Sequence, residues 1–388
     1  MSHVQSSAPP ARSFSSLLLW LACAAVVAFS VWVILGEWGR VLPPHGLWDF
    51  GAFLASGRAA AEGLNPYGIY PPLTPHVVFP GFEAWNPNLN PPISALLFQA
   101  FDLAPPERSL QVWNLVSVAC YVLTIGLLAW RYTPHWGALV LAAWALALAG
   151  FWDTLYLGQI YIPLVLAATG AWLLLERRQM VWAGILIGLV VALKPNFLVW
   201  TVLLFLAGYR QASLWSVVCA AVISAIPLAF FGPEIYVQWL ELVVSDGARA
   251  MFLTNASLSG FTARAGIPFL GTAVSAAMLL ALAAWAVFRR PSVMRVSSFA
   301  LLGAVMASPL GWIHYTLFLL PVIVGYWRRW PMWLVGVMLA VPVPFVLGYF
   351  GAASAVQITI GSVYGWALVV CLVTLVFARE PEPLALRT

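Results

Sequence analysis

Long apolar runs, separated by short clusters of Arg, Pro and Gly, follow one another along almost the whole chain. The first run, Phe14–Gly36, has about 23 residues, enough for a helix to cross a hydrocarbon layer of ~30 Å. No small-residue cleavage site follows it, so we interpret it as a membrane span and not as a cleaved signal. Several later runs are shorter than about 18 residues, which predicts short, broken or re-entrant helices. The later runs are residues 91–104, 108–130, 136–151, 157–175, 180–194, 195–209, 211–231, 268–288, 296–309, 312–327, 330–350 and 359–377.

Arginine clusters at the ends of these runs predict the orientation of the chain, because cytoplasmic loops carry an excess of positive residues. With the clusters in the cytoplasm, the long loops at residues 37–90 and 232–267 lie on the opposite, extracytoplasmic side. Three polar breaks between runs then lie there as well, at Gly158-Gln159, Lys194-Pro195 and Ser308–Trp312. The clusters are Arg177-Arg178, Arg210, Arg289-Arg290 with Arg295, Arg328-Arg329 and Arg379.

Both termini are cytoplasmic only if the number of crossings is even, so one of the apolar runs must not cross. We expect residues 136–151 to be re-entrant and about 12 crossings to remain. This arrangement leaves Arg131 on the extracytoplasmic side, where the charge rule disfavours it. The predicted fold is an all-α polytopic membrane protein with one integral domain, residues 14–378, between cytoplasmic tails at residues 1–13 and 379–388.

Composition excludes several classes of protein. Of the 388 residues, 63% are hydrophobic and 8% are charged, and the mean hydropathy is +0.92. So few charges could not keep this much apolar surface in solution, so a soluble enzyme, a disordered protein and a DNA-binding protein are excluded. The formal net charge of +5 fits loop charges that orient a membrane protein. The cysteines lie inside apolar runs without metal-binding spacing, so we interpret them as buried thiols; they are Cys23, Cys120, Cys219 and Cys371.

The long first loop predicts two kinds of local structure. Its small residues predict a short helix over residues 49–62, lying flat in the membrane interface and ending at Gly63. A Pro-rich stretch from Pro71 to Pro92 then excludes a long helix or a central strand. This stretch is either a stiff, extended lid over the membrane face or a simple connecting loop.

Asp49 is the first candidate for chemistry, because the chain holds few aspartates and this one begins the short helix of the first loop. Its carboxylate could cap the N-terminus of that helix, where the helix dipole favours negative charge. It could also act as a general base held at the membrane surface. The two interpretations are compatible, because capping occupies one oxygen and leaves the other free.

Three cationic residues are candidates for binding a phosphate. Lys194, the only lysine of the chain, interrupts an apolar double run, where an ionisable residue is a functional hypothesis or a snorkelling side chain. Arg264 suits bidentate phosphate recognition, although it could be a plain loop charge. His314 follows a Pro-Gly break that could line a cavity, where it would donate to a phosphate or carry a proton; alternatively it is an interhelical hydrogen-bonding residue.

Gln159 is a weaker candidate, because polar amides often join neighbouring helices, and Asp153 nearby could be a second carboxylate. The chain has no GxGxxG, P-loop, HExxH, GxSxG or DxD signature. The residue set therefore requires neither a metal nor another cofactor, and a mechanism based on metal and nucleotide lacks support.

Six sequence elements, in this order, resemble glycosyltransferase family 87, a family of polytopic enzymes that includes polyprenyl-phosphate-mannose-dependent mannosyltransferases. The resemblance extends over residues 50–315, approximately, and it is carried by the ordered set, because each element alone is weak. The elements are Asp49 with Gly63 and Tyr67; Asn90-Pro91-Pro92; Gly158-Gln159; Gly184-x3-Gly188-x5-Lys194-Pro195; Asn255-x-Ser257-Leu258-x-Gly260 with Arg264; and Ser308-Pro309-x-x-Trp312-x-His314.

The resemblance implies a GT-C-type fold with the active site at the extracytoplasmic face of the plasma membrane. The implied donor is a polyprenyl-phospho-sugar, and the implied acceptor is a lipid-linked glycan or a glycolipid. We expect metal-independent transfer of a hexosyl unit, mannosyl by resemblance, with inversion. Asp49 would be the catalytic base, and Lys194, Arg264, His314, Gln159 and Asn255 would bind substrate.

Two other functions remain open at this point. A transporter or flippase of lipid-linked sugars would also have many spans with polar residues near their middle, but it predicts an internal repeat, which we do not find. A non-catalytic scaffold of an envelope complex predicts that Asp49 tolerates substitution.

Overall fold

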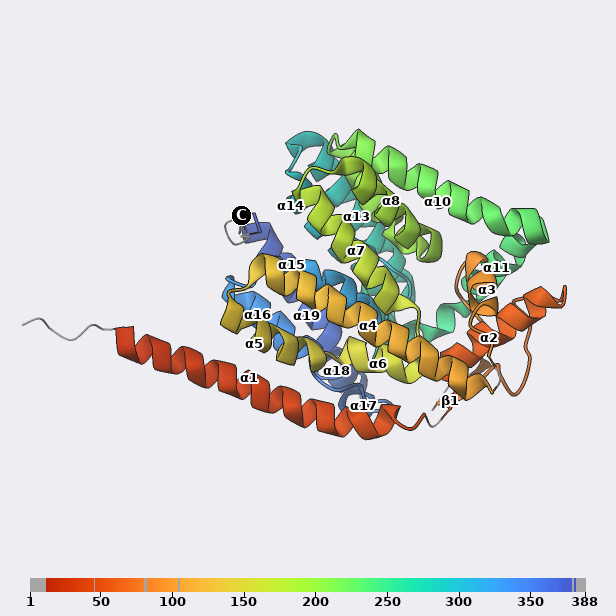
Figure 1. Ribbon diagram of the computed structural model, residues 1–388, viewed down its shortest axis with the longest axis horizontal. Coiled ribbons are helices and arrows are strands. Elements are labelled where there is room, and N and C mark those ends of the chain that lie inside the picture. The colour runs from red at the N-terminus through yellow and green to blue at the C-terminus, as the bar shows by residue number, and fades with distance from the viewer. Residues whose placement is uncertain (1–11, 45, 80–81, 104, 379, 382–388) are drawn as a thin grey trace, which may run out of the picture.

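The computed structural model describes residues 12–44, 46–79, 82–103, 105–378 and 380–381, and these residues are mostly helical (Figure 1). The predicted tails at residues 1–13 and 379–388, and Arg379, lie almost entirely outside the described residues. The first half contains α1 (Arg12–Val41), α2 (Trp48–Ala61), β1 (His76–Phe79), β2 (Phe82–Trp85), α3 (Ile93–Gln99), α4 (Pro106–Tyr132), α5 (His135–Leu146), α6 (Ala149–Leu157), α7 (Tyr161–Glu176), α8 (Met180–Leu193), η1 (Pro195–Phe197) and α9 (Leu198–Leu206). The second half contains α10 (Arg210–Phe231), α11 (Glu234–Ser245), η2 (Asp246–Met251), α12 (Leu258–Arg264), α13 (Pro268–Arg289), α14 (Val293–Met306), η3 (Ile313–Leu319), α15 (Leu320–Gly325), α16 (Trp330–Leu339), α17 (Val343–Leu347), α18 (Ser354–Thr359) and α19 (Val363–Phe377).

Helix length and composition confirm a polytopic membrane protein. Four helices of the described chain are long and apolar enough to cross a membrane: Trp20–Val41 within α1, then α4, α10 and α13. The pair formed by α5 and α6 makes a fifth candidate if its 50° bend is counted inside one span. Seven shorter apolar helices or helix pairs accompany them, so the prediction of about 12 crossings stays a prediction.

The structure corrects the expected course of residues 91–157. The run at residues 91–104 forms only the seven-residue helix α3, which at 1.5 Å per residue is far too short to cross. In contrast, residues 136–151 belong to the bent α5–α6 pair, which extends between the same two ends of the molecule as α7 (Figure 1). Counting helix length, the run at residues 91–104 is too short to cross, and the bent α5–α6 pair is either one broken span or a re-entrant loop, so the expected re-entrant segment at residues 136–151 stays a prediction.

Arg131 lies beside the end of α7 and not with the polar loops. Its guanidinium pairs with Glu176 at the end of α7, with 2.7 Å between Nε and Oε2. Glu176 directly precedes the pair Arg177-Arg178. Arg131 thus belongs to the arginine-rich end of the molecule, and the exception to the charge rule disappears because α3 does not cross.

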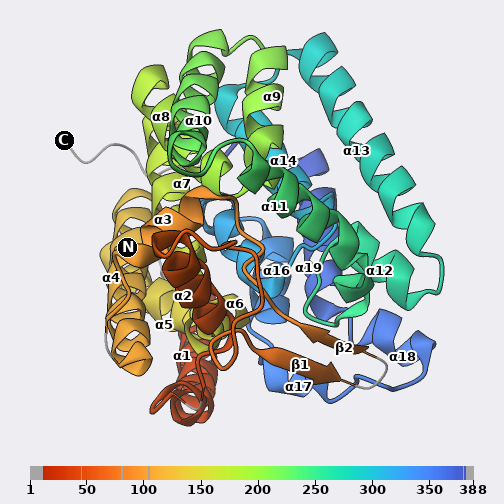
Figure 2. The same ribbon diagram turned by 90° about the vertical axis from the view of Figure 1, so that its right-hand side faces the viewer.

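The first loop folds differently from the prediction. A helix does form as predicted, and α2 is buried on most of its length and packs against α3; its position in the membrane interface stays a prediction. The Pro-rich stretch contains an antiparallel hairpin of β1 and β2, with His76 opposite Trp85 and Phe79 opposite Phe82. Figure 2 shows this hairpin beside α17 and below α11 and α12. A two-stranded hairpin has only edge strands, which is why the flanking prolines do not prevent it.

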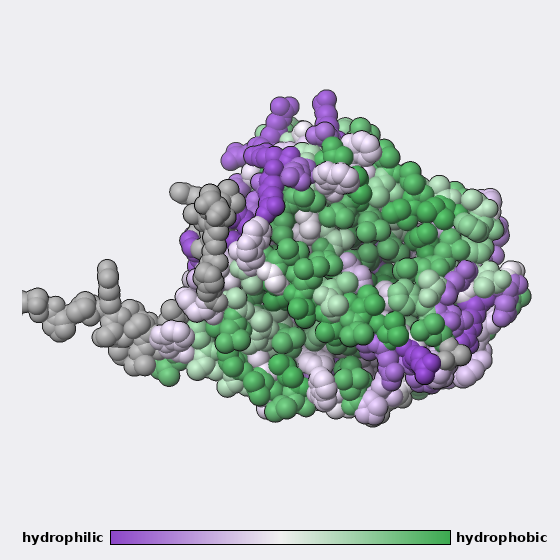
Figure 3. Space-filling view, viewed as in Figure 1, coloured by the Kyte–Doolittle hydropathy of each residue, from purple (hydrophilic) through white to green (hydrophobic). Residues whose placement is uncertain are grey.

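The surface of the molecule has two polar ends with apolar surface between them. In the view of Figure 3, hydrophilic residues gather at the upper left and at the lower right, with apolar surface between them. The helix α2, the hairpin and α11 lie together at one end, toward the right in Figure 1. An apolar belt between two polar ends is the pattern that a bilayer requires, because its hydrocarbon core cannot hydrate polar groups.

Candidate active site

Asp49 lies in the first turn of α2 and does not cap it. The N-cap residue is Leu47, and no side chain makes a capping hydrogen bond there. Trp48, the residue before Asp49, has φ +42°, a conformation that bulky residues rarely adopt and that often occurs at functional sites. The capping interpretation is therefore wrong, and the carboxylate of Asp49 points toward other elements of the protein.

Two side-chain amides hold that carboxylate. Asn86, just after β2, donates from Nδ2 to Oδ1, and Gln159 donates from Nε2 to Oδ2. Burial raises the pKa of Asp49 to about 6, although the nearby charge of Arg249 and the two amide hydrogen bonds oppose that rise. The side chain of Asp49 keeps part of its surface exposed. A carboxylate with such a pKa is ionised near neutral pH and still basic enough to accept a proton.

Gly158 explains how Gln159 reaches Asp49. It ends α6 in the left-handed conformation, with φ +68°. A Cβ atom at this position would lie 2.5 Å from the Cβ of Phe50, in α2. Only glycine tolerates both the left-handed turn and the close approach of the two helices. Gly158 therefore allows the end of α6 to pack against the start of α2, where Gln159 reaches Asp49.

Lys194 lies where the double run breaks, directly after α8 and before η1. Its ammonium donates to Asn90 Oδ1 at 2.6 Å and to the hydroxyl of Tyr161 at 2.9 Å. It also lies 4.3 Å from the ring centroid of Tyr161 and 5.5 Å from that of Tyr315. Within the described chain two of its three hydrogens thus have oxygen acceptors, which leaves one for a ligand.

His314, in η3, has one nitrogen bound and one without a partner. Its Nδ1 lies 3.2 Å from Oδ2 of Asp153, whose other oxygen lies 3.9 Å from Nη2 of Arg40. Nε2 is buried and has no hydrogen-bond partner among the described residues. Gly150 makes this pairing possible, because a Cβ there would lie 2.9 Å from the carbonyl oxygen of Ile313.

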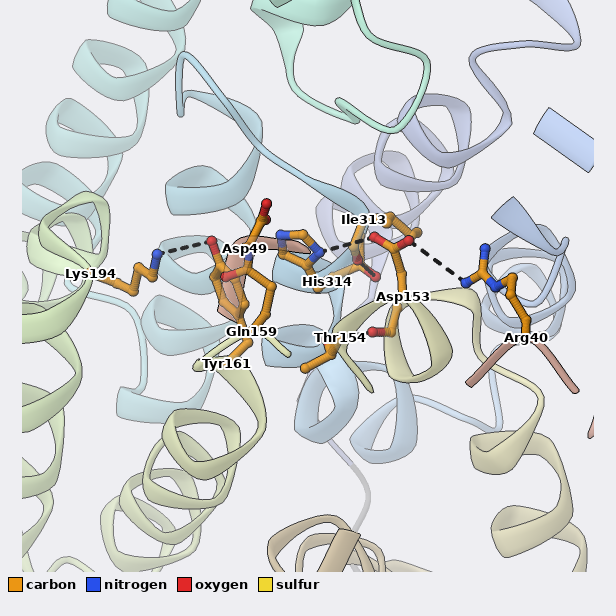
Figure 4. Close-up of polar contacts among 11 residues, drawn as sticks. Arg40, Asp49, Asp153, Thr154, Gln159, Tyr161, Lys194, Ile313 and His314 are labelled. Atoms are coloured by element: carbon orange, nitrogen blue, oxygen red, sulfur yellow. Dashed lines mark hydrogen bonds and ion pairs between the residues drawn. The ribbon is translucent and has the colours of Figure 1, made fainter. Parts of the chain in front are cut away.

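The aromatic ring of Tyr161 joins these groups into one site. Its ring centroid lies 4.3 Å from that of His314, and its hydroxyl accepts from Lys194. Tyr161 is two residues after Gln159, the partner of Asp49. Figure 4 shows the resulting row of side chains, from Lys194 past Asp49 and His314 to Asp153 and Arg40.

An asparagine segment, Asn86-Pro87-Asn88-Leu89-Asn90, connects the carboxylate with the cation. Asn86 binds Asp49, and Asn90 binds Lys194. Between them, Asn88 donates to Ser56 of α2 and to Ser94 of α3 and accepts from both the backbone and the side chain of Asn90. Alternating residues of this extended segment therefore fix Asp49 and Lys194 relative to each other.

Arg264 and Asn255 are buried apart from this row and hold a loop together. Arg264 donates to Ser362 and to the carbonyl oxygens of Phe252 and Asn255, at 2.8 to 3.1 Å. The side chain of Asn255 bonds the backbone of Ala250, Ser257, Pro309 and Gly311. In the part of the chain that the structure describes, neither has a polar contact with Asp49, Lys194 or His314. These contacts favour a structural role for both residues.

Several residues of the site were not singled out from the sequence. Arg249, Asn86, Tyr161 and Arg40 are buried or partly buried polar groups whose partners lie far away along the chain. The alternating asparagines of residues 86–90 were the one local signal available, because three amides in a stiff extended segment must find partners. The described residues contain no group of three or more His, Cys, Asp or Glu side chains that could hold a metal ion; metal independence stays a prediction.

Comparison with known proteins identifies the family of the chain. Glycosyltransferase family 87 matches residues 88–309, which is more than half of the chain. A curated protein of Mycobacterium tuberculosis (strain CDC 1551 / Oshkosh), the polyprenol-phosphate-mannose-dependent alpha-(1-2)-phosphatidylinositol pentamannoside mannosyltransferase, is 25% identical over 334 residues, covering 82% of this chain and 73% of that protein. No solved structure matches. The family match extends over Gln159 and Lys194 but not over Asp49 or His314, whose roles therefore rest on geometry. The chain belongs to glycosyltransferase family 87 and is a membrane-embedded glycosyltransferase.

Proposed function

We propose that this enzyme transfers a hexosyl unit, mannosyl by analogy with its relative, from a polyprenyl-phospho-sugar to a glycolipid or lipid-linked glycan. Transfer takes place at the extracytoplasmic face, with inversion and without a metal. Asp49 is the general base, and Lys194 and His314 bind the donor phosphate. One observation carries this proposal: a carboxylate on a residue that is not fully buried shares a site with a lysine and a histidine that both have a free hydrogen-bonding position.

The chemistry needs each of these groups. The acceptor hydroxyl attacks the anomeric carbon, its proton passes to Asp49, and the bond from that carbon to the phosphate oxygen breaks. The leaving polyprenyl phosphate then carries one more negative charge. Lys194 and, when protonated, Nε2 of His314 stabilise that charge, since groups fixed in place lower a barrier without reorganising. Asp153 holds His314 through Nδ1 and thereby directs Nε2 away from itself.

The donor, the acceptor and the side of the membrane are supported by different observations. The name of the mycobacterial relative specifies polyprenol-phosphate-mannose as donor and a phosphatidylinositol mannoside as acceptor. The site lies at the end of the molecule away from Arg131 and Arg177, and arginines concentrate on the cytoplasmic side of membrane proteins. A lipid-carried donor is the form of activated sugar that remains accessible on the other side.

The first test compares the wild type with Asp49→Asn in detergent or vesicles, using polyprenyl-phospho-mannose as donor and a phosphatidylinositol mannoside as acceptor. Loss of a positioned general base predicts a fall in kcat of about 10²–10⁴-fold. Because asparagine keeps the size of the side chain, donor binding should change little. Mannosyl transfer is measured by mass spectrometry of the lipid product.

Asp102→Asn is the matched control. Asp102, just after α3, binds Arg58 near the other end of α2, so its substitution removes a carboxylate that contacts α2 without touching the site. We expect it to retain near wild-type kcat. Undiminished transfer by Asp49→Asn would refute the assignment of the base, and absence of transfer by the wild type with any hexosyl donor would refute the function.

A further inference from the structure

Arg249, in the extracytoplasmic loop between α10 and α13, reaches the site through an intermediate side chain. Its Nη1 donates to Asn86 Oδ1 at 2.6 Å, and its Nη2 donates to the carbonyl oxygen of Trp85 at 3.0 Å. The guanidinium also lies 5.5 Å from the ring centroid of Phe82, in β2. Arg249 is only 7% exposed. A buried arginine with these contacts ties η2 to the end of the hairpin.

Donor and acceptor chemistry makes this contact directional. A guanidinium only donates, and an ionised carboxylate only accepts. Asn86 lies between the two and must turn its oxygen to Arg249 and its NH2 group to Asp49. The reverse orientation would place an amide oxygen against a carboxylate and an NH2 group against a cation. Arg249 thereby fixes which end of the Asn86 amide meets the catalytic base.

We propose that Arg249 is a positioning residue that acts on Asp49 through Asn86, so that the loop at residues 232–267 sets the orientation and the hydrogen bonding of the catalytic base. The inference deepens the function proposed above and rests on it. A second contact of the same loop supports the coupling: Trp239, in α11, donates from Nε1 to the carbonyl oxygen of Leu89 at 3.1 Å. The loop thus forms hydrogen bonds with the asparagine segment at two residues, Asn86 and Leu89.

Several charged or titratable groups face Asp49 and define what removal of Arg249 does. Arg249 lowers the pKa of the Asp49 carboxyl and Asp153 raises it, while burial makes the largest contribution and raises it. Lys194 and Tyr161 also interact electrostatically with Asp49. Burial and Asp153 both raise the pKa of Asp49, and removal of Arg249 or of the Asn86 amide removes a group that lowers it. The pKa of Asp49 should then rise further above its present value of about 6.

The experiment measures kcat/KM against pH for the wild type, Arg249→Gln, Arg249→Lys and Asn86→Ala. The acid limb should shift to higher pH in Arg249→Gln and in Asn86→Ala. A shift of about one unit makes each variant about tenfold slower below the pKa, and its rate approaches that of the wild type at alkaline pH. Arg249→Lys keeps a positive donor, so its acid limb should lie between those of the wild type and the glutamine variant.

Arg131→Gln is the control, because it removes another paired and largely buried arginine, 11% exposed, at the opposite end of the molecule. It should lower thermal stability without moving the acid limb. A purely structural Arg249 would behave in the same way, and that outcome would overturn the proposal. So would additive shifts in the double variant Arg249→Gln/Asn86→Ala, because two residues acting through one contact are not additive.

The two proposals fail in distinguishable ways. If Asp49→Asn is inactive at every pH but Arg249→Gln keeps the wild-type acid limb, only the positioning role of Arg249 is wrong. If Asp49→Asn transfers sugar normally, the proposed function itself is wrong. Should Arg249→Gln fail to fold, Arg249→Lys and Asn86→Ala still test the same contact, and two unshifted profiles would overturn it.

Discussion

At the scale of single residues, the environment of Asp49 combines burial with hydrogen bonds that oppose its effect. Two side-chain amides donate to the carboxylate, and the guanidinium of Arg249 donates to one of them, Asn86. Burial nevertheless raises the pKa of Asp49 to about 6. The protein thus keeps the carboxylate ionised near neutral pH but makes it a stronger base than a solvated aspartate.

This environment predicts the pH dependence of the wild type. A general base must be deprotonated to work, so kcat/KM should be level above about pH 7 and fall as the pH drops through about 6. The measurement is initial-rate mannosyl transfer between pH 5 and pH 9, in buffers of constant ionic strength. An acid limb near pH 4, as in an ordinary aspartate, would contradict the burial of Asp49 described here.

At the scale of elements, close packing between helices fixes the positions of the helix ends that carry site residues. In α8, the pair Gly184-x3-Gly188 faces α10, where a Cβ on Gly184 would lie 2.4 Å from the carbonyl oxygen of Ala212 and one on Gly188 2.5 Å from that of Ser216. Small residues four apart allow two backbones to approach, the usual basis of helix association in membranes. This contact fixes α8, and with it the position of Lys194 after its last turn.

Gly188→Ala should therefore push α8 away from α10. Overpacking of this kind costs about 1–3 kcal/mol, which we expect to see as a lower Tm in detergent. The matched control is Gly126→Ala, in α4, where an added Cβ meets nothing within 4 Å. That control should be neutral or slightly stabilising, because alanine favours a helix over glycine. Equal Tm values for both variants would show that the approach of α8 to α10 is not tight.

At the scale of the whole molecule, the arginine-rich end and the site are separated by apolar surface (Figure 3). The helix α4 spans that distance, from the site end to Arg131 beside Glu176 (Figure 1). Because charged residues are costly in hydrocarbon and arginines concentrate on the cytoplasmic side, this separation predicts a cytoplasmic arginine-rich end and an extracytoplasmic site.

Single cysteines at the two ends should therefore react from opposite sides of the membrane. In a variant without its four native cysteines, Glu62→Cys, after α2, and Arg289→Cys, at the end of α13, are both exposed positions. A thiol reagent that does not cross the membrane should label the first from outside intact cells and the second only after lysis. Labelling of both from the same side would refute the orientation and the extracytoplasmic site.

Much of the fold could be predicted from the sequence, but less of the site. The breaks at Gly158 and Lys194 and the helix that begins near Asp49 follow from glycine, proline and charge inside apolar runs. The non-crossing segment at residues 91–104 was misassigned, because apolar composition does not distinguish a buried short helix from part of a span. The hairpin was missed because prolines hide weak edge strands.

The sequence by itself determined that this chain lies in a membrane, because long apolar runs can satisfy their backbone hydrogen bonds there only as helices. It also predicted an orientation and singled out the candidate carboxylate. Only the tertiary structure decided which polar residues meet. Asp49 and Gln159 are 110 positions apart, and Asn86 and Arg249 are 163 apart, so no local pattern joins them. The structure also shows Arg264 and Asn255 binding the backbone of a loop. The sequence could not show this, because either side chain can bind a phosphate or a backbone group, and only the packing of the chain decides which partner is within reach.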